Sequence, residues 1–201
     1  MKVEDIDKQV EDSPLTKEQS KEQFVEMTEK LGLEHSFNFE EAWEIGQEIR
    51  KRNQYRQGIT EFEEKIKTEG IAMSEEEMQK ANPVKHSFAD GCYIREIFNP
   101  ANELLVTKIH KKEHPFFLMK GSMSILTEDG VIRIEAPHSG ITKVGTKRII
   151  YTHTDCVFIT VHATDKTDVK EIEKEVIADD FSDPQITTED IDLLRMSITN
   201  K

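Results

Sequence analysis

The spacing of apolar residues divides the chain into three parts. Between residues 16 and 70 they recur every three or four positions, as in Phe24, Met27 and Leu31, which predicts amphipathic helices. From residue 92 to residue 162, short segments rich in Ile, Val, Phe and Thr alternate with turn residues, which is typical of antiparallel strands. Helical spacing returns from Asp168 onward. We therefore expect a mainly β protein with helical additions.

Side chains that cap helix N-termini mark where the predicted helices begin. Thr16-Lys17-Glu18-Gln19 is a capping-box pattern, and the helix it opens is expected to end at Gly32. Further helix starts are predicted at Asn38, Asp168 and Thr187, and a short helix is predicted between residues 73 and 83. The helix that begins at Asn38 carries Trp43, which we expect to dock this helix on the strands.

Seven short strands are predicted in the middle of the chain. Thr127-Glu128-Asp129-Gly130-Val131 is the clearest hairpin, because Asp-Gly tolerates the positive backbone angles that such turns require. The spacing indicates an antiparallel sandwich or small barrel. The predicted strands are 92–98, 104–110, 114–120, 122–127, 131–135, 148–152 and 156–162.

Charge supports the same division into three parts. The chain of 201 residues has a net charge of −13, and residues 1–80 carry 21 acidic against 12 basic side chains. We therefore predict an acidic helical arm over residues 1–83, a β-barrel over 84–165 and C-terminal helices over 166–201. Such an acidic chain is not expected to bind nucleic acid, which attracts basic surfaces.

Composition also bears on where the protein acts. No apolar run approaches the roughly 18 residues of a membrane span, and the first residues lack the apolar stretch of a secretory signal. The two cysteines, Cys92 and Cys156, exclude a disulfide framework, and we expect both to be buried and inert. These features predict a cytoplasmic protein with no membrane partner.

Two histidines stand at the ends of neighbouring predicted strands. One strand ends at His110, a polar connection follows, and the next strand begins at His114. Neutral imidazole nitrogens bind divalent metals and polar ligands. We expect the two rings to point into one shared cavity. Strand alternation then predicts that Lys108 points inward with His110, and Lys120 with His114.

The spacing of these residues resembles the first motif of the cupin superfamily, G-x5-H-x-H-x3–4-E-x6-G. The interval from His114 to Gly121 matches the E-x6-G half, so His114 stands at the glutamate position. His110 then stands at the second histidine of the motif, and Lys108 at the first. The resemblance covers about residues 84–165 and implies an antiparallel jelly-roll barrel with an interior pocket.

The second cupin motif, P-x-G-x2-H-x3-N, survives only as a remnant. Gly145 fits, whereas Arg148 stands at the metal histidine and Thr152 at the asparagine. The amino-acid sequences of segments 86–96, 108–114 and 145–153 are similar to those of small cupin-like proteins of tailed phages. This similarity implies a phage-encoded protein that acts in the host cytoplasm.

The resemblance implies a divalent metal such as Fe, Mn, Ni or Zn, which cupins hold with three histidines and a carboxylate. Lys108 and Arg148 occupy two of those four positions here, and a cation at about 4 Å from the metal would cost several kcal/mol. A metal site therefore needs a rearranged ligand set. We expect His110, His114 and His153, and the alternatives for the third ligand are His162, Glu113 and His138.

An anion is the other ligand that these residues fit. Arg148 can bind a carboxylate or phosphate through two parallel donors. Tyr151 points to the opposite side of its strand from Arg148, so at most one of them belongs to the pocket, and we favour Arg148. The candidate ligand-binding residues are His110, His114, Lys108, Arg148, Lys120 and Tyr151.

Three functions are consistent with the sequence. The first is a binding protein that holds a small polar or anionic molecule or a metal, and that sequesters a host small molecule if it is phage-encoded. The second is a metal-dependent cupin enzyme of the isomerase or dioxygenase type, and the third is a structural or assembly protein of a phage particle. Because closing an exposed sheet edge is favourable, we also predict a homodimer or higher homo-oligomer.

Overall fold

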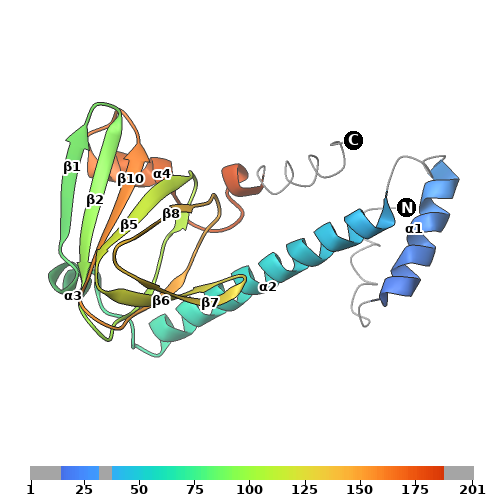
Figure 1. The fold of residues 1–201 in the computed structure, drawn as a ribbon, viewed down its shortest axis with the longest axis horizontal. Coiled ribbons are helices and arrows are strands. Elements are labelled where there is room, and N and C mark those ends of the chain that lie inside the picture. The colour runs from blue at the N-terminus through green and yellow to red at the C-terminus, as the bar shows by residue number, and fades with distance from the viewer. Residues whose placement is uncertain (1–14, 32–37, 188–201) are drawn as a thin grey trace. The chain divides into compact units, whose positions relative to one another are not determined.

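A computed structural model of the chain describes residues 15–31 and 38–187 (Figure 1). The described residues divide into two compact units, residues 15–31 with 38–49, and residues 50–187. The predicted end of the first helix at Gly32 lies outside the described residues. The predicted start of the last helix at Thr187 is wrong, because the chain is already helical from Pro184; the rest of that predicted helix lies outside the described residues.

The first unit contains helix α1 (Lys17–Leu31) and the beginning of helix α2 (Phe39–Thr68). The predicted capping box opens α1, since the Gln19 N–H donates to Thr16 Oγ1 and the Thr16 N–H donates to Gln19 Oε1. The Phe39 ring lies 5.5 Å from the ring of Phe24 and 6.0 Å from that of Trp43. The docking of Trp43 on the strands stays a prediction.

The second unit contains the strands, which form three antiparallel sheets. The larger sheets have the orders β1-β2-β10-β5-β8 and β3-β9-β6-β7, and β11 pairs with β4. A mainly β, antiparallel architecture with helical additions is therefore confirmed, whereas closure into a jelly-roll barrel stays a prediction. The strands are β1 (Val84–Ala89), β2 (Cys92–Asn99), β3 (Leu104–Val106), β4 (Ile109–His110), β5 (His114–Lys120), β6 (Ser122–Thr127), β7 (Gly130–Glu135), β8 (His138–Thr142), β9 (Ile149–Thr152), β10 (Cys156–Ala163) and β11 (Ile177–Ala178).

The predicted hairpin is confirmed, with Thr127 paired to Gly130 and Gly130 at a φ of 110°. The single strand predicted over 104–110 is wrong, because its two halves pair with different sheets. Val106 pairs with Ile149 of β9, whereas His110 pairs with Ile177 of β11. Strands β1, β8 and β11 were not among the predicted ones, since their sequences lack the dense β-branched pattern of the others.

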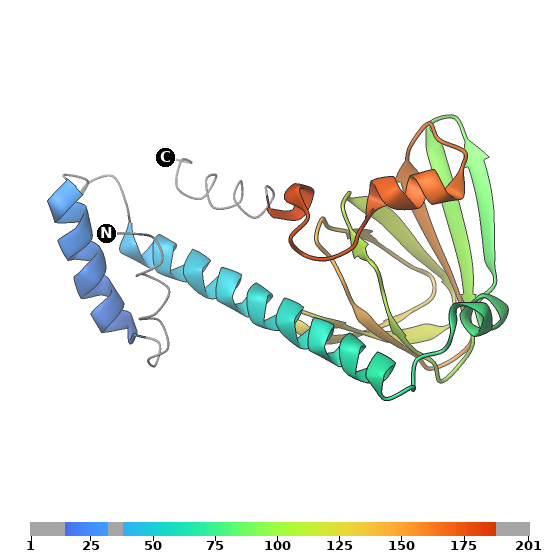
Figure 2. The same ribbon diagram turned by 180° about the vertical axis from the view of Figure 1, so that it is seen from behind.

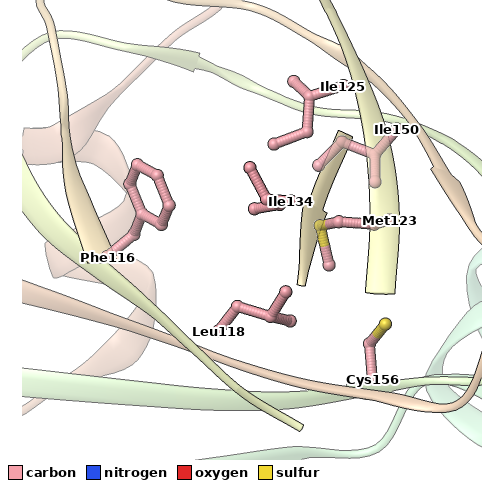
Figure 3. Close-up of a cluster of buried hydrophobic side chains, with 7 residues drawn as sticks. All are labelled: Phe116, Leu118, Met123, Ile125, Ile134, Ile150 and Cys156. Atoms are coloured by element: carbon pink, nitrogen blue, oxygen red, sulfur yellow. The ribbon is translucent and has the colours of Figure 1, made fainter. Parts of the chain in front are cut away.

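The main hydrophobic core lies between the two larger sheets (Figure 3). Phe116, Leu118 and Cys156 come from the five-stranded sheet, and the four-stranded sheet contributes Met123, Ile125, Ile134 and Ile150. Side chains alternate along each strand, so these residues identify the inward face of each sheet. Cys156 is buried as predicted, but Cys92 is partly exposed.

Helical segments complete this unit, among them a short one over residues 184–187 (Figure 2). The part of α2 beyond Arg50 is joined to the strands by Tyr55, whose hydroxyl lies within hydrogen-bond distance of the carbonyls of Leu126 and Lys147. Helix α3 (Glu75–Ala81) precedes β1 and begins at a capping box. Helix α4 (Val169–Val176) packs Ile172 and Val176 against Tyr93 of β2. Among the described residues, no helix is long and apolar enough to cross a membrane.

Candidate functional site

Three histidine rings gather on the inward side of the five-stranded sheet. The ring centroid of His114 lies 4.3 Å from that of His110 and 4.3 Å from that of His162, and His110 and His162 are 6.0 Å apart. His114 and His162 are buried, at 2% and 4% exposure. We call these three residues the histidine cluster. The rings of His110 and His114 thus lie side by side, and His162 joins them, while the cavity that the two rings were expected to share stays a prediction.

Sheet register explains why these residues meet. Along β10, Cys156, Phe158, Thr160 and His162 alternate onto the inward face, and Thr160 pairs with Phe116 of β5. His114 lies on the same face of β5, two residues before Phe116. His110 reaches the cluster from β4, whose pairing with β11 holds it beside the start of β5. The apolar end of the inward face forms the core, and its other end forms the cluster.

The hydrogen bonds of the cluster leave two imidazole nitrogens without partners. His114 Nδ1 donates to the Lys112 carbonyl at 3.2 Å, which leaves its Nε2 as the acceptor of a neutral ring. His162 Nε2 lies 3.1 Å from Thr160 Oγ1. Among the described residues, the Nδ1 atoms of His110 and His162 are buried and have no hydrogen-bond partner. Buried polar atoms without partners are uncommon and are a reason to look for a ligand.

Burial keeps the three imidazoles neutral. It lowers the pKa of His110 to about 2, with further lowering by its histidine neighbours and by Arg148 and Arg95. It lowers the pKa of His162 to about 4, and that of His114 is also lowered chiefly by burial. Withdrawal from water disfavours the charged form, and the neighbouring guanidinium charges act in the same direction.

Arg148 lies beside the cluster in a fixed position. Its Nη1 donates to Thr142 Oγ1 at 3.2 Å, and its guanidinium lies 5.4 Å from the centroid of the Phe116 ring. The Phe116 ring in turn stacks on Phe158 at 5.3 Å and covers Gly140, where an added Cβ would lie 2.7 Å from ring carbons. The charge of Arg148 also lowers the pKa of both His110 and His114, which supports its predicted placement near these two histidines.

Arg95 approaches the cluster from β2. It pairs with Thr160 of β10 across the sheet, so it lies on the inward face, and it lowers the pKa of His110 and His162. Its neighbour on that face, Tyr93, lies with its ring 6.0 Å from the ring of His162. The Tyr93 hydroxyl lies 2.6 Å from Nδ1 of His86, on the adjoining strand β1. Tyr93 and His86 thus border the cluster on the β1 side.

The histidine cluster does not fit the divalent metal that the cupin resemblance implies. Across residues 15–31 and 38–187, no three His, Cys, Asp or Glu side chains are arranged so that they could hold a metal ion. The charges near the cluster are also unfavourable, since Arg148 and Arg95 both act on His110 as cations. A divalent ion there would be repelled by two guanidinium groups.

The structure places four other predicted residues away from the cluster. His153 is expected with His110 and His114, but its Nε2 lies 2.8 Å from Ser124 Oγ on the four-stranded sheet. Tyr151 is 37% exposed and donates its hydroxyl hydrogen bond to Asn102, as its alternation with Arg148 predicts. Lys108 and Lys120 are exposed.

The expected inward orientation of the two lysines is therefore wrong, for two physical reasons. Alternation from His110 back to Lys108 fails because the chain leaves its strand between β3 and β4. At the end of β5, the pairing with β10 shifts register next to Lys120, so the alternation of β5 is interrupted there.

Two site residues were missed by sequence reasoning, Arg95 and Tyr93. The sequence predicts His162 only as an alternative metal ligand. Side-chain alternation along β10 and β2 places all three residues on one face. This can be inferred only once it is known that the two strands are neighbours.

Comparisons with known proteins concern only part of the chain. No protein-family model matches it, and no curated protein matches it. Solved structures with similarity include a cupin-2 domain protein from Shewanella frigidimarina, at 11% identity and a TM-score of 0.35, covering 40% of this chain and 79% of that one. Acetylacetone dioxygenase from Acinetobacter johnsonii matches at 18% identity and a TM-score of 0.36, covering 41% and 59%. The cupin_2 domain of an XRE family transcriptional regulator from Enterobacter cloacae matches at 10% and 0.37, covering 43% and 99%.

Proposed function

We propose that this protein binds a small anionic molecule at the histidine cluster, with Arg148 as the principal anion-binding residue. The observation that carries the proposal is a partly buried guanidinium without a carboxylate partner among the described residues, next to imidazole nitrogens that also lack partners. A carboxylate or phosphate would accept charge-assisted hydrogen bonds from Arg148 and neutral ones from imidazole N–H groups.

Local contacts must supply this affinity, because the chain as a whole repels anions. Its net charge of −13 creates a long-range field that slows the approach of a negative ligand and is screened by salt. Close to Arg148, however, a partly desolvated guanidinium outweighs distant surface charges. The proposal therefore predicts that moderate salt speeds association, while the affinity depends on Arg148 itself.

Binding without turnover is the form of this function that the site supports best. The cluster offers neutral imidazoles and cations, and it does not fit a metal, so the isomerase or dioxygenase alternative has no ligand set among the described residues. If the protein is phage-encoded, as the resemblance in its sequence implies, we propose that it sequesters a small host metabolite. The phage-particle role has no specific observation in its favour.

Calorimetry with inorganic phosphate and succinate as probes tests the proposal. Both should bind the purified protein, and Arg148→Gln should weaken binding about ten-fold or more. Lys120→Gln, which removes an exposed cation, should leave the affinity within about two-fold. If neither phosphate nor succinate binds, the proposal is overturned.

Metal analysis of the same protein tests the alternative. A stoichiometric transition metal that is lost on His110→Ala would replace the anion site with a metal site. We expect no such metal, because of the two cations beside His110.

A homodimer remains our proposal for the assembly. The outer strands of the five-stranded sheet are β1 and β8, and outer strands present backbone groups that favour pairing. Light scattering on the full chain should give twice the monomer mass of 23.2 kDa, and the monomer mass would contradict the proposal.

A further inference from the structure

Two guanidinium groups, rather than one, flank the histidine cluster. Arg148 precedes β9 and Arg95 lies on β2, and both lower the pKa of His110. The strand order places β2 on one side of β10, while Arg148 is anchored to Thr142 of β8, on the far side of β5. The two cations therefore reach the cluster from opposite sides.

Neither cation is neutralised by an ion pair within the described residues. Arg95 and Arg148 are both partly buried, and this withdrawal from water lowers the pKa of each. Arginine nevertheless keeps its proton in proteins. The site thus holds two positive charges, and its three histidines are neutral.

The groups that face Arg95 and Arg148 do not cancel these two positive charges. Arg148 is influenced by the Tyr55 phenol, and Arg95 by the Tyr93 phenol and the Glu173 carboxylate of α4. Both phenols have raised pKa values and stay neutral. Glu173 is exposed, so water screens much of its effect on Arg95.

We infer that the ligand of this site carries two anionic groups, one bound by Arg148 and the other by Arg95, with its middle against the histidine cluster. This inference rests on the proposed function, and it names the ligand class as small dicarboxylates or molecules with a phosphate at one end and a carboxylate at the other. A singly charged ligand would leave one partly buried guanidinium unneutralised, whereas a two-ended dianion neutralises both.

A pair of probes of equal length tests this inference. Succinate and butyrate each have four carbons, but succinate has a carboxylate at both ends. By calorimetry with the full chain, succinate should bind about ten-fold or more tightly than butyrate. A series from malonate to adipate should show one preferred length, since Arg95 is held by β2 and Arg148 by its hydrogen bond to Thr142 of β8. Equal affinity for succinate and butyrate would overturn the inference.

Variants of the two arginines separate the two proposals. Arg95→Gln should weaken succinate binding about ten-fold and leave butyrate within about two-fold, because butyrate uses only Arg148. Arg148→Gln should weaken both probes. Lys120→Gln serves as the control that removes an exposed cation.

The outcomes have distinct meanings. If Arg148→Gln weakens both probes but Arg95→Gln affects neither, the anion site stands and the two-ended ligand is wrong. If neither probe binds the unmodified chain, the proposed function itself fails. Circular dichroism and thermal unfolding of each variant establish that it is folded before its affinity is compared.

Discussion

The ring of His114 lies 4.3 Å from the ring of His162, although 47 residues separate them in the chain. His114 opens β5 and His162 lies near the end of β10, and the two strands are antiparallel neighbours. Their contact therefore depends on the pairing of β5 with β10. It joins a histidine that a local motif indicates to one that no local motif indicates.

Acid should destabilise the protein in a pH range set by the histidine cluster. The pKa of His162 is about 4 and that of His110 about 2 when folded, against an ordinary 6.5. As the pH falls below 6.5, the unfolded chain takes up protons at these two positions and the folded protein does not. The free energy of unfolding should therefore fall by about 1.4 kcal/mol per pH unit for each imidazole.

Urea unfolding measured between about pH 7.5 and pH 4.5 checks this expectation. The stabilising contribution of the two neutral imidazoles is fully present above pH 6.5 and is lost as the pH falls below that value. Glu175, whose pKa of about 2 is lowered mainly by its hydrogen bond with Lys112, adds its own loss only below its ordinary value of 4.5. A His110→Asn and His162→Asn double variant should flatten the profile, and an unchanged slope would contradict the assignment.

His162→Leu should separate stability from binding. The change removes a buried Nδ1 that has no partner and whose burial costs about 1–3 kcal/mol. This gain offsets the loss of the contact between His162 Nε2 and Thr160. The free energy of unfolding should stay level or rise by about 1 kcal/mol in thermal or urea unfolding. Succinate binding should weaken in calorimetry, since functional residues are often kept at a cost in stability.

His86→Leu is the matched comparison. His86 is exposed, but it is the partner of the Tyr93 hydroxyl at 2.6 Å, and Tyr93 is buried. Loss of that partner should lower the free energy of unfolding by about 1–2 kcal/mol. If His162→Leu proves the more destabilising of the two, the cluster serves packing rather than a ligand.

The ion pair between Glu63 and Lys147 should fasten α2 to the strands. Lys147 is 8% exposed, and its ammonium contacts the Glu63 carboxylate. Glu63→Gln leaves the buried ammonium without its counter-charge and should cost about 3 kcal/mol in urea unfolding. The double variant Glu63→Leu with Lys147→Met should recover most of that loss, and a double variant as unstable as Glu63→Gln would contradict this view of the pair.

Gly140→Ala should disturb the support of Arg148. An added Cβ would lie 2.7 Å from the Phe116 ring, which must then move away from the guanidinium that it faces. We expect a loss of about 1–3 kcal/mol in stability and weaker succinate binding. In Gly58→Ala the new methyl meets open space on a helix, so that control should gain up to about 1 kcal/mol and bind normally.

Local patterns predicted much of the secondary structure. The capping box at Thr16, the two-residue turn before Gly130 and the outward side of Tyr151 all follow from interactions within a few residues of the chain. The strand predicted over 104–110 failed because the second half of that segment pairs with β11, near the other end of the chain. Local spacing carries no information about such a partner.

The sequence by itself determined a mainly β chain with helical additions, and it predicted His110, His114 and Arg148 as site residues. Both results rest on strand alternation and motif spacing, which are properties of residues close together in the chain. Only the tertiary structure decided that His162 and Arg95 join them and that Lys108, Lys120 and His153 do not. The physical reason is that strand order and register depend on pairing between distant segments. The order β2-β10-β5 brings three separate stretches of sequence onto one buried face.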